Sequence, residues 1–225
     1  MAANARARRA ARRRPSGHRL FAFDRKLGVR LVAGADEAGR GCLAGPLVVA
    51  AVCLDLERVN KRRLRDLDDS KRVDPETRER LAEAILDCAA GVAVIVVSSD
   101  QIDKRGLHRS NLSGMERALR ALGSRPEVRL TDGFHLPAGC GLEHRRIIGG
   151  DGRSAAIAAA SIIAKTTRDR YMHTVADRYP GYGFETHVGY ITPEHTAAVR
   201  SHGATPLHRR SFQAAAYREE IEALA

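Results

Sequence analysis

The sequence predicts an α/β fold in one globular domain. Short apolar runs of strand length alternate along the chain with longer segments whose apolar residues recur at helical spacing. The chain has 225 residues, of which 44% are hydrophobic and 29% charged, enough to bury one substantial core. Because no internal repeat interrupts this alternation, a repeat architecture is not expected.

The first half of the chain is expected to hold three strands and one helix. Residues 30–35 and 47–54 are apolar runs of strand length, separated by a glycine-rich turn. Residues 75–89 carry apolar side chains at helical spacing, with Asp74 placed to cap the helix N-terminus. Residues 92–97 follow that helix and have the composition of a buried strand.

The second half continues the alternation. Short apolar runs at 128–131 and 145–148 are expected to be strands. Four helices are expected in this half, the last two forming a C-terminal extension from about residue 193: 111–122, 155–174, 193–201 and 211–224.

The N-terminus is strongly basic and is expected to lie outside the folded domain, which we place at 20–225. Residues 1–19 carry seven arginines and no acid, which leaves +4 of the formal net charge of +11 for the rest of the chain. Such a segment is typical of a disordered tail that attracts phosphates. An organellar transit peptide has a similar composition, and both interpretations stay open at this point.

Nothing in the sequence predicts a membrane segment or a disulfide framework. A spanning helix needs about 20 apolar residues, and no run of that length is present. The charged residues 24–26 break the stretch after the basic segment, so it does not resemble a secretion signal. The four cysteines form no C-x-x-C pair. We therefore expect a cytoplasmic protein without a membrane partner.

Acidic residues recur where predicted strands end. Asp36 and Glu37 follow the first strand, Asp132 follows the strand at 128–131, and Asp151 follows the strand at 145–148. Each lies close to glycine, and acids at strand ends beside flexible backbone can gather into one pocket. Carboxylate oxygens favour Mg²⁺ or Mn²⁺ over zinc, and no His/Cys cluster at metal spacing competes with them. In so basic a chain, these acids indicate phosphodiester chemistry.

Other interpretations of the first acidic motif fit less well. Residues 39–44 match the dinucleotide pattern G-x-G-x-x-G/A, but Gly45 and Pro46 follow, so these glycines join two strands and do not open a helix. A P-loop would need Gly-Lys-Ser/Thr, which is missing. An acidic hairpin turn would explain Asp36 and Glu37 alone, and would not explain the similar settings of Asp132 and Asp151.

Several local phrases of the sequence together resemble the type 2 ribonucleases H in their bacterial form. The resemblance is collinear from about residue 31 to residue 212. It is carried by GADEAGRG at 34–41, DSK at 69–71, NL at 111–112 with Met115, TDG at 131–133, GD at 150–151, AASIIAK at 159–165, RDR at 168–170, YPGYGF at 179–184, GY at 189–190 and HRRSF at 208–212.

This resemblance implies a ribonuclease H fold, in which a central mixed sheet is flanked by helices. It also implies that the four acids Asp36, Glu37, Asp132 and Asp151 form a site for two Mg²⁺ or Mn²⁺ ions. Since crowded carboxylates repel one another, at least one is expected to hold its proton more tightly than a lone acid. Asp169 lies between two arginines in a helix, and a salt-bridged structural role is expected for it instead.

The resemblance further implies how a substrate is recognised. Backbone groups of Gly39, Arg40 and Gly41 would contact the 2′-OH, which both donates and accepts hydrogen bonds. Tyr190 would pack against the neighbouring deoxyribose. Candidates for phosphate contacts are Ser70, Lys71, Lys165 and Arg168.

The expected activity is hydrolysis of the phosphodiester 5′ of a ribonucleotide embedded in duplex DNA, and of the RNA strand of RNA/DNA hybrids, leaving 3′-hydroxyl and 5′-phosphate ends. The protein is expected to act as a monomer. Two alternatives stay open: another nuclease of this fold, such as a junction resolvase indifferent to the 2′-OH, and a basic nucleic-acid-binding module without catalysis.

Overall fold

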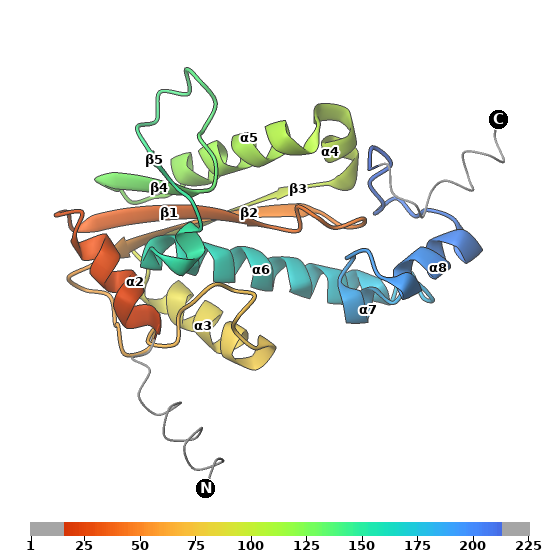
Figure 1. Cartoon of the computed structure of the whole chain (residues 1–225), viewed down its shortest axis with the longest axis horizontal. Coiled ribbons are helices and arrows are strands. Elements are labelled where there is room, and N and C mark those ends of the chain that lie inside the picture. Colours follow the sequence, from red (N-terminus) through yellow and green to blue (C-terminus); the bar gives the residue numbers. More distant parts are fainter. Residues whose placement is uncertain (1–15, 213–225) are drawn as a thin grey trace, which may run out of the picture.

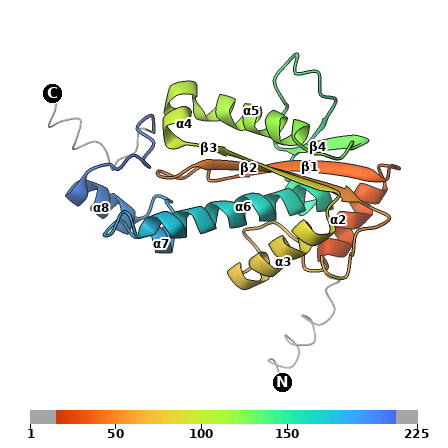
Figure 2. The same cartoon turned by 180° about the vertical axis from the view of Figure 1, so that it is seen from behind.

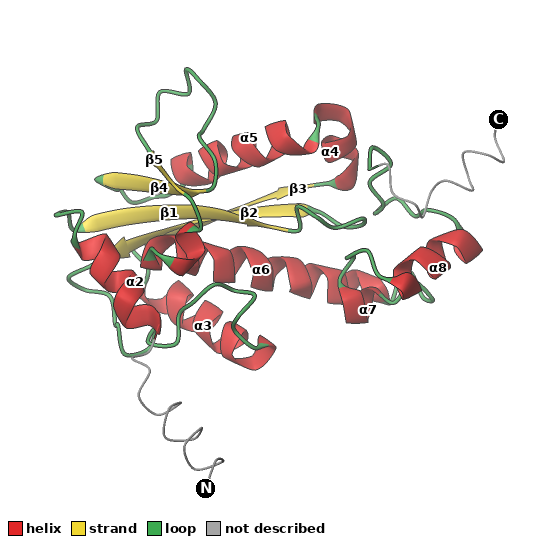
Figure 3. Ribbon diagram, viewed as in Figure 1, coloured by secondary structure: helices red, strands yellow, loops and turns green. Residues whose placement is uncertain are grey.

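The computed structural model describes residues 16–212 as a five-stranded sheet between layers of helices (Figure 1 and Figure 3). The strands are β1 (Leu31–Ala38), β2 (Leu47–Asp55), β3 (Gly91–Val97), β4 (Val128–Asp132) and β5 (Arg145–Ile147). The α-helices are α2 (Ser16–Arg25), α3 (Pro75–Cys88), α4 (Ser99–Arg105), α5 (Leu107–Arg120), α6 (Ala155–Ala176), α7 (Phe184–His187) and α8 (Pro193–His202). A short 3₁₀ helix, η1 (Gly150–Gly152), precedes α6.

The sheet is mixed, as the resemblance implied. Its strand order is β3-β2-β1-β4-β5. The chain runs antiparallel from β1 to β2 and from β2 to β3, and then parallel from β1 to β4 and from β4 to β5. Helix α5 covers one face of the sheet, whereas α6, α3 and α2 cover the other (Figure 2). The central strand β1 is therefore enclosed on both faces.

Strand β2 shows why the sheet has two cores. All of its residues are buried, and successive side chains of a strand point to opposite faces. Val48, Ala50 and Val52 belong to the core beneath α6, whereas Val49 and Ala51 pack with the residues of α5. A continuous apolar run, and not an alternating one, is what a strand buried on both faces requires.

Helix α6 begins very close to β1. A Cβ added at Gly34 would overlap the backbone of Ala156 and Ile157, so only glycine allows this approach. Gly34 lies two residues before Asp36 in the same strand. The close contact consequently fixes the start of α6 next to the acid-bearing end of β1.

The N-terminus of α6 is capped by two side chains. Ser154 accepts a hydrogen bond from the backbone N–H of Ile157, 3.3 Å away, and Asp24 of α2 accepts one from Ala156, 2.9 Å away. Asp24 is fully buried, and this burial raises its pKa to about 6, more than its hydrogen bonds lower it. Helix α2 thus contributes a capping carboxylate to the helix that supports the site.

The structure corrects several sequence expectations. Residues 16–19 form the first turn of α2 and not the end of a tail. Helix α4 was not expected, although Ser98 and Gln101 form a capping box at its start, and α5 begins at Leu107, before the expected 111. The helix expected at 211–224 lies almost wholly outside the described residues, and residues 211–212 are not helical. Among the helices that the structure describes, none is long and apolar enough to cross a membrane.

The buried carboxyl group of Asp24 should make the stability of the fold depend on pH. Because its pKa is raised from 3.8 to about 6, the folded state is stabilised relative to the unfolded state below pH 4, and this contribution is lost as the pH rises through 6. The loss amounts to about 3 kcal/mol at most. Asp24→Asn keeps an acceptor for Ala156 without a titrating group. The free energy of unfolding of the variant, measured with urea from pH 4 to 8, should therefore rise relative to the wild type as the pH rises, and parallel pH profiles would contradict this account.

Candidate active site

Strand pairing brings Asp36 and Asp132 together. In the parallel register of β1 and β4, Ala35 is paired with Thr131. Asp36 and Asp132 are the next residues of the two strands, so both carboxylates lie at the same end of the sheet. Asp36 is almost fully buried, at 5% exposure, and its Oδ1 accepts a hydrogen bond of 2.8 Å from the backbone of Glu37.

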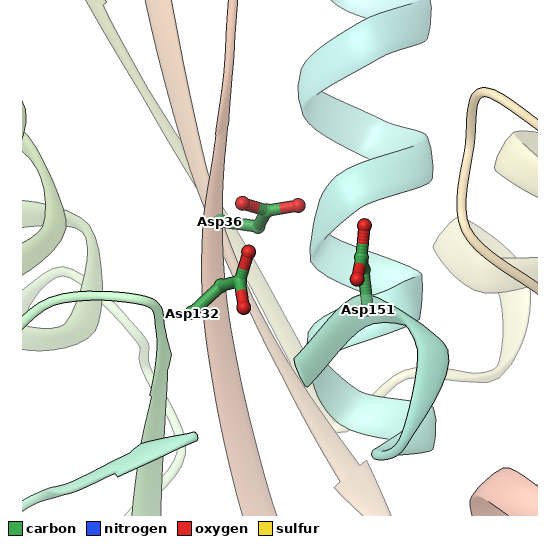
Figure 4. Close-up of side chains that lie close together, drawn as sticks. All are labelled: Asp36, Asp132 and Asp151. Atoms are coloured by element: carbon green, nitrogen blue, oxygen red, sulfur yellow. The ribbon is translucent and has the colours of Figure 1, made fainter. Parts of the chain in front are cut away.

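Asp151 approaches from the other side, on η1. The backbone N–H of Gly150 donates a hydrogen bond of 2.6 Å to Asp132 Oδ1, which ties η1 to the end of β4. One carboxylate oxygen each from Asp36, Asp132 and Asp151 lies within 4.8 Å of the other two (Figure 4). Three of the four acids expected from the sequence are therefore gathered in one place.

The gathered acids hold their protons tightly. Burial, reinforced by the negative charges of Glu37 and Asp132, raises the pKa of Asp36 well above its ordinary value. Burial is also the main cause that raises the pKa of Asp132 and of Asp151, and Asp69 adds to both by repulsion. The expectation that crowding shifts at least one of these acids is confirmed. Asp69 itself was not expected to influence the site.

Glu37 lies beside the three aspartates but does not belong to their compact group. Its carboxylate pairs with Arg40 at 3.9 Å, and the side chain of the buried Asn111 on α5 lies next to it. Its Oε2 is buried and has no hydrogen-bond partner among the described residues. Burial raises the pKa of Glu37 as well. An unsatisfied carboxylate oxygen of this kind is available to a further ligand.

This arrangement fits a hard divalent cation. The donor set consists of carboxylate oxygens, and burial with mutual repulsion makes the cluster costly unless positive charge is added. Lys71 is the lysine whose charge acts on Glu37, Asp132 and Asp151, and its side chain is exposed at the rim. Mg²⁺ or Mn²⁺ held by Asp36, Asp132 and Asp151, with Glu37 beside them, would relieve the repulsion.

Residues 39–46 form the wall next to the acids. Gly39 has a φ of +89°, and a Cβ there would overlap the side chain of Arg168. Gly41 is exposed, whereas the guanidinium of Arg40 stacks over the ring of Phe134, 4.3 Å from its centroid. At Gly39 and Gly41, the loop can therefore offer only backbone groups to a ligand.

Two expected phosphate contacts are corrected by the structure. Arg168 is fully buried and donates to the carbonyl oxygens of Ala44, Pro46 and Val188 at 2.8–3.0 Å. Ser70 is 4% exposed, and its hydroxyl accepts a hydrogen bond of 2.9 Å from Ser161. Neither side chain is presented to a duplex, because both are used to hold the interior together.

Tyr190 lies where the loop at 39–46 meets the segment after α7. The backbone N–H groups of Leu43 and Ala44 donate to the carbonyl of Gly189 at 2.9 and 3.2 Å. Tyr190 is 36% exposed, and Lys165 Nζ lies 5.3 Å from the centroid of its ring. Lys165 also pairs with Asp169 at 2.7 Å, and Asp169 pairs with Arg78 at 3.2 Å, so the structural role expected for Asp169 is confirmed.

Sequence reasoning missed the residues that support this wall from behind. Arg209 is fully buried and donates to the carbonyls of Gly45 and Arg40 at 2.9–3.1 Å. Asn111 beside Glu37 and Ser161 beside Asp36 were recognised as parts of sequence phrases without a role. No local pattern could have assigned these roles, because each partner is distant in the sequence.

Comparison with known proteins shows which sequences and which fold this chain resembles. The sequence model of the family described as Ribonuclease HII matches residues 33–215. The chain is 48% identical to Ribonuclease HII of Geobacillus kaustophilus over 207 residues, 91% of this chain and 76% of that protein. It is 48% identical to Ribonuclease HII of Geobacillus thermodenitrificans over 86% of this chain and 73% of that protein. The crystal structure of ribonuclease H2 from Pyrococcus horikoshii superposes with a TM-score of 0.72 at 29% identity, covering 86% of this chain and 98% of that one.

The acid cluster predicts metal affinity that depends on its members. Asp132→Asn should weaken Mn²⁺ binding, measured by calorimetry, by more than about tenfold, since even groups behind the ligands contribute that much. Binding should tighten as the pH rises, because the raised pKa values of Asp36, Asp132 and Asp151 mean that protons compete with the ion. Asp100→Asn, an exposed acid paired with Lys104, is the matched control and should bind like the wild type. Unchanged affinity in Asp132→Asn would remove this residue from the ligand set.

Proposed function

Because this chain belongs to the ribonuclease HII family of metal-dependent ribonucleases H, we propose that it hydrolyses the phosphodiester 5′ of a ribonucleotide embedded in duplex DNA. On RNA/DNA hybrids it degrades the RNA strand. Both reactions leave 3′-hydroxyl and 5′-phosphate ends. The observation that carries this proposal is the close grouping of Asp36, Asp132 and Asp151 at one end of the sheet.

In the proposed reaction, the acids hold divalent cations next to the phosphate that is cleaved. When bound, a pair of Mg²⁺ or Mn²⁺ ions supplies Lewis-acid activation of water and stabilisation of the leaving 3′-oxygen. Asp36 has the most rigid support, because β1 is paired on both sides and α6 packs against it. Asp36, Asp132 and Asp151, with Glu37 beside them, would hold the ions, and Asp36 would be the most firmly positioned of these ligands. Lys71, exposed at the rim, is proposed to contact a phosphate of the substrate.

The backbone at 39–41 is proposed to recognise the 2′-OH. The positive φ of Gly39 and the exposure of Gly41 allow close backbone approach, which suits a hydroxyl that both donates and accepts. Tyr190 then packs against the deoxyribose on the neighbouring nucleotide. Its ring is half-buried and lines a hollow of about 620 Å³ together with Val188 and Glu194. Lys165, next to the ring, is the second candidate for a phosphate contact, although Asp169 already neutralises part of its charge.

The proposal also covers the oligomeric state, the cellular location and the role of the N-terminal segment. One subunit contains all four acids, so the protein is proposed to act as a monomer. A cytoplasmic location agrees with the expected role, removal of misincorporated ribonucleotides and of primer RNA. The basic N-terminal segment, outside the described residues, would add affinity for the duplex without choosing the cleavage position.

Cleavage of three end-labelled duplexes of one sequence tests the function. With Mg²⁺ or Mn²⁺, the all-DNA duplex should stay intact, the duplex with one ribonucleotide should be cut once on its 5′ side, and the RNA/DNA hybrid should be degraded. Asp36→Asn should lower turnover by more than about 10²-fold, the scale for losing one group that stabilises transition-state charge. Its substrate affinity should change little, since Asp36 binds metal and not phosphate. Asp100→Asn serves again as the control.

Other outcomes of this assay would identify the alternatives. Cleavage of the all-DNA duplex at a comparable rate would indicate a nuclease indifferent to the 2′-OH, such as a resolvase. Binding without cleavage of any duplex, unchanged by Asp36→Asn, would indicate a non-catalytic module.

Tyr190→Ala should separate the two ribonucleotide-containing substrates. A single embedded ribonucleotide offers one ribo-to-deoxyribo step for the ring, whereas a long hybrid offers many cleavable positions without it. The variant should therefore lose more kcat/KM on the single-ribonucleotide duplex than on the hybrid, by about tenfold, the range of one lost stacking contact. Equal losses on both substrates would contradict the proposed role of Tyr190.

A further inference from the structure

Three imidazoles lie behind the backbone that carries Tyr190. The rings of His187 and His195 are stacked with centroids 4.4 Å apart, and Nε2 of His195 lies 3.1 Å from Nε2 of His208. His195 and His208 are 0% and 2% exposed. The three histidines have no metal-ligand spacing in the sequence, and neither the acids nor their metal ions involve them.

Backbone partners determine which nitrogen of each buried ring carries the proton. The N–H of Thr205 donates to Nδ1 of His208 at 2.9 Å, so the proton of a neutral His208 is on Nε2. Nε2 of His195 lies 3.1 Å from that Nε2–H and accepts from it, which places the proton of His195 on Nδ1. Nδ1 of His195 lies 2.8 Å from the carbonyl oxygen of Tyr190 and donates to it. A directed chain of hydrogen bonds therefore runs from Thr205 to the backbone of Tyr190.

His187 holds the residues on the other side of Tyr190. Its Nδ1 accepts a hydrogen bond of 3.1 Å from the N–H of Gly189, so its Nε2–H donates to the carbonyl of Tyr182 at 2.7 Å. The carbonyl of His187 accepts the N–H of Tyr190 at 2.9 Å. Both the N–H and the carbonyl of Tyr190 are thus bound to histidines, whereas Tyr190 itself is partly exposed.

We propose that His195 and His208 are positioning residues for Tyr190, and that this chain of hydrogen bonds sets the ring where it meets the deoxyribose. The inference rests on the proposed function, since it assumes that role for Tyr190. The ring is flanked by two cations, Lys165 at 5.3 Å and Arg168 at 5.9 Å from its centroid, and its hydroxyl interacts with the thiol of the buried Cys42. Cys42 holds the hydroxyl end of the side chain, and the histidines hold the backbone from which the ring starts.

The chain requires neutral imidazoles. A proton added to Nε2 of His195 would leave two N–H groups facing each other across 3.1 Å. Burial lowers the pKa of His195, and burial with repulsion from His195 lowers the pKa of His208 to about 4. The other titratable and charged groups around them are Glu194 of α8, His187, His202 against Tyr182, Arg209, and Arg168 and Lys165 at the Tyr190 ring. Because burial and the neighbouring histidines lower both pKa values, the neutral state persists through neutral pH.

Nitrogen-detected NMR of the full wild-type chain tests the proton arrangement without a mutation. Histidine side-chain ¹⁵N spectra at pH 7.5 should show the Nδ1–H tautomer for His195 and the Nε2–H tautomer for His187 and His208. A charged imidazole, or the opposite tautomer at His195, would overturn the inference.

Two substitutions at His195 separate its two hydrogen bonds. His195→Gln can accept from His208 but does not reach the Tyr190 carbonyl, and it should lower kcat/KM on the single-ribonucleotide duplex by about tenfold, the value of one hydrogen bond. The loss on the RNA/DNA hybrid should be smaller. His195→Asn places an N–H where Nδ1 was and should recover most of the loss. His173→Gln, on the exposed side of α6, is the matched control.

A double variant decides whether His195 acts through Tyr190. In the Tyr190→Ala background, His195→Gln should cause no further selective loss, because there is no ring left to position. Additive losses, or equal losses on both substrates, would overturn the inference while leaving the proposed function intact. If Tyr190→Ala alone does not distinguish the substrates, the proposed role of Tyr190 fails instead. Thermal unfolding of each variant identifies losses that come from misfolding.

Discussion

The repulsion between carboxylates is the constraint on which the rest of the structure depends. Asp36, Asp132 and Asp151 place oxygens within 4.8 Å of one another in a half-buried setting, where like charges interact strongly. Side chains on mobile loops would move apart. Here Asp36 and Asp132 belong to paired strands, and η1 is tied to Asp132 through the N–H of Gly150. The fold therefore keeps the carboxylates close together despite their repulsion, and only added positive charge would relieve it.

Much of this arrangement could be predicted from the sequence. The strands before Asp36 and Asp132 were recognised as apolar runs. Acids at the ends of strands that meet at one edge of a sheet are brought close together by the pairing of those strands. The ion pairing of Asp169 followed from its helical setting, although its partners are Lys165 and Arg78 and not the adjacent arginines. Local sequence pattern was sufficient to predict a contact wherever the residues that meet lie in the same helix or at the ends of recognised strands.

The rest depends on contacts that no local pattern reveals. Arg168 was expected to contact phosphate because it lies in one of the phrases that carry the family resemblance. Its carbonyl partners at Ala44 and Pro46 are more than 120 residues away in the sequence. The burial of Ser70 against Ser161 and the separation of Glu37 from the three aspartates likewise follow from how α6 and α5 dock on opposite faces of β1. Side-chain alternation in β1 shows that Asp36 and Glu37 face different ways, yet it does not show how far apart their oxygens lie.

The attachment of Tyr190 to the loop at 39–46 has a consequence for how the protein measures its substrate. Gly189 is bound to Leu43 and Ala44, and Arg168 joins both segments from below, so the two segments form a single rigid unit. Their separation is therefore set by contacts within the protein. A ligand that fits at one end cannot draw the other end toward it. If these segments contact adjoining sugars as proposed, the protein compares the spacing of the two sugars as well as their chemistry, and a duplex with an altered helical rise would bind less well.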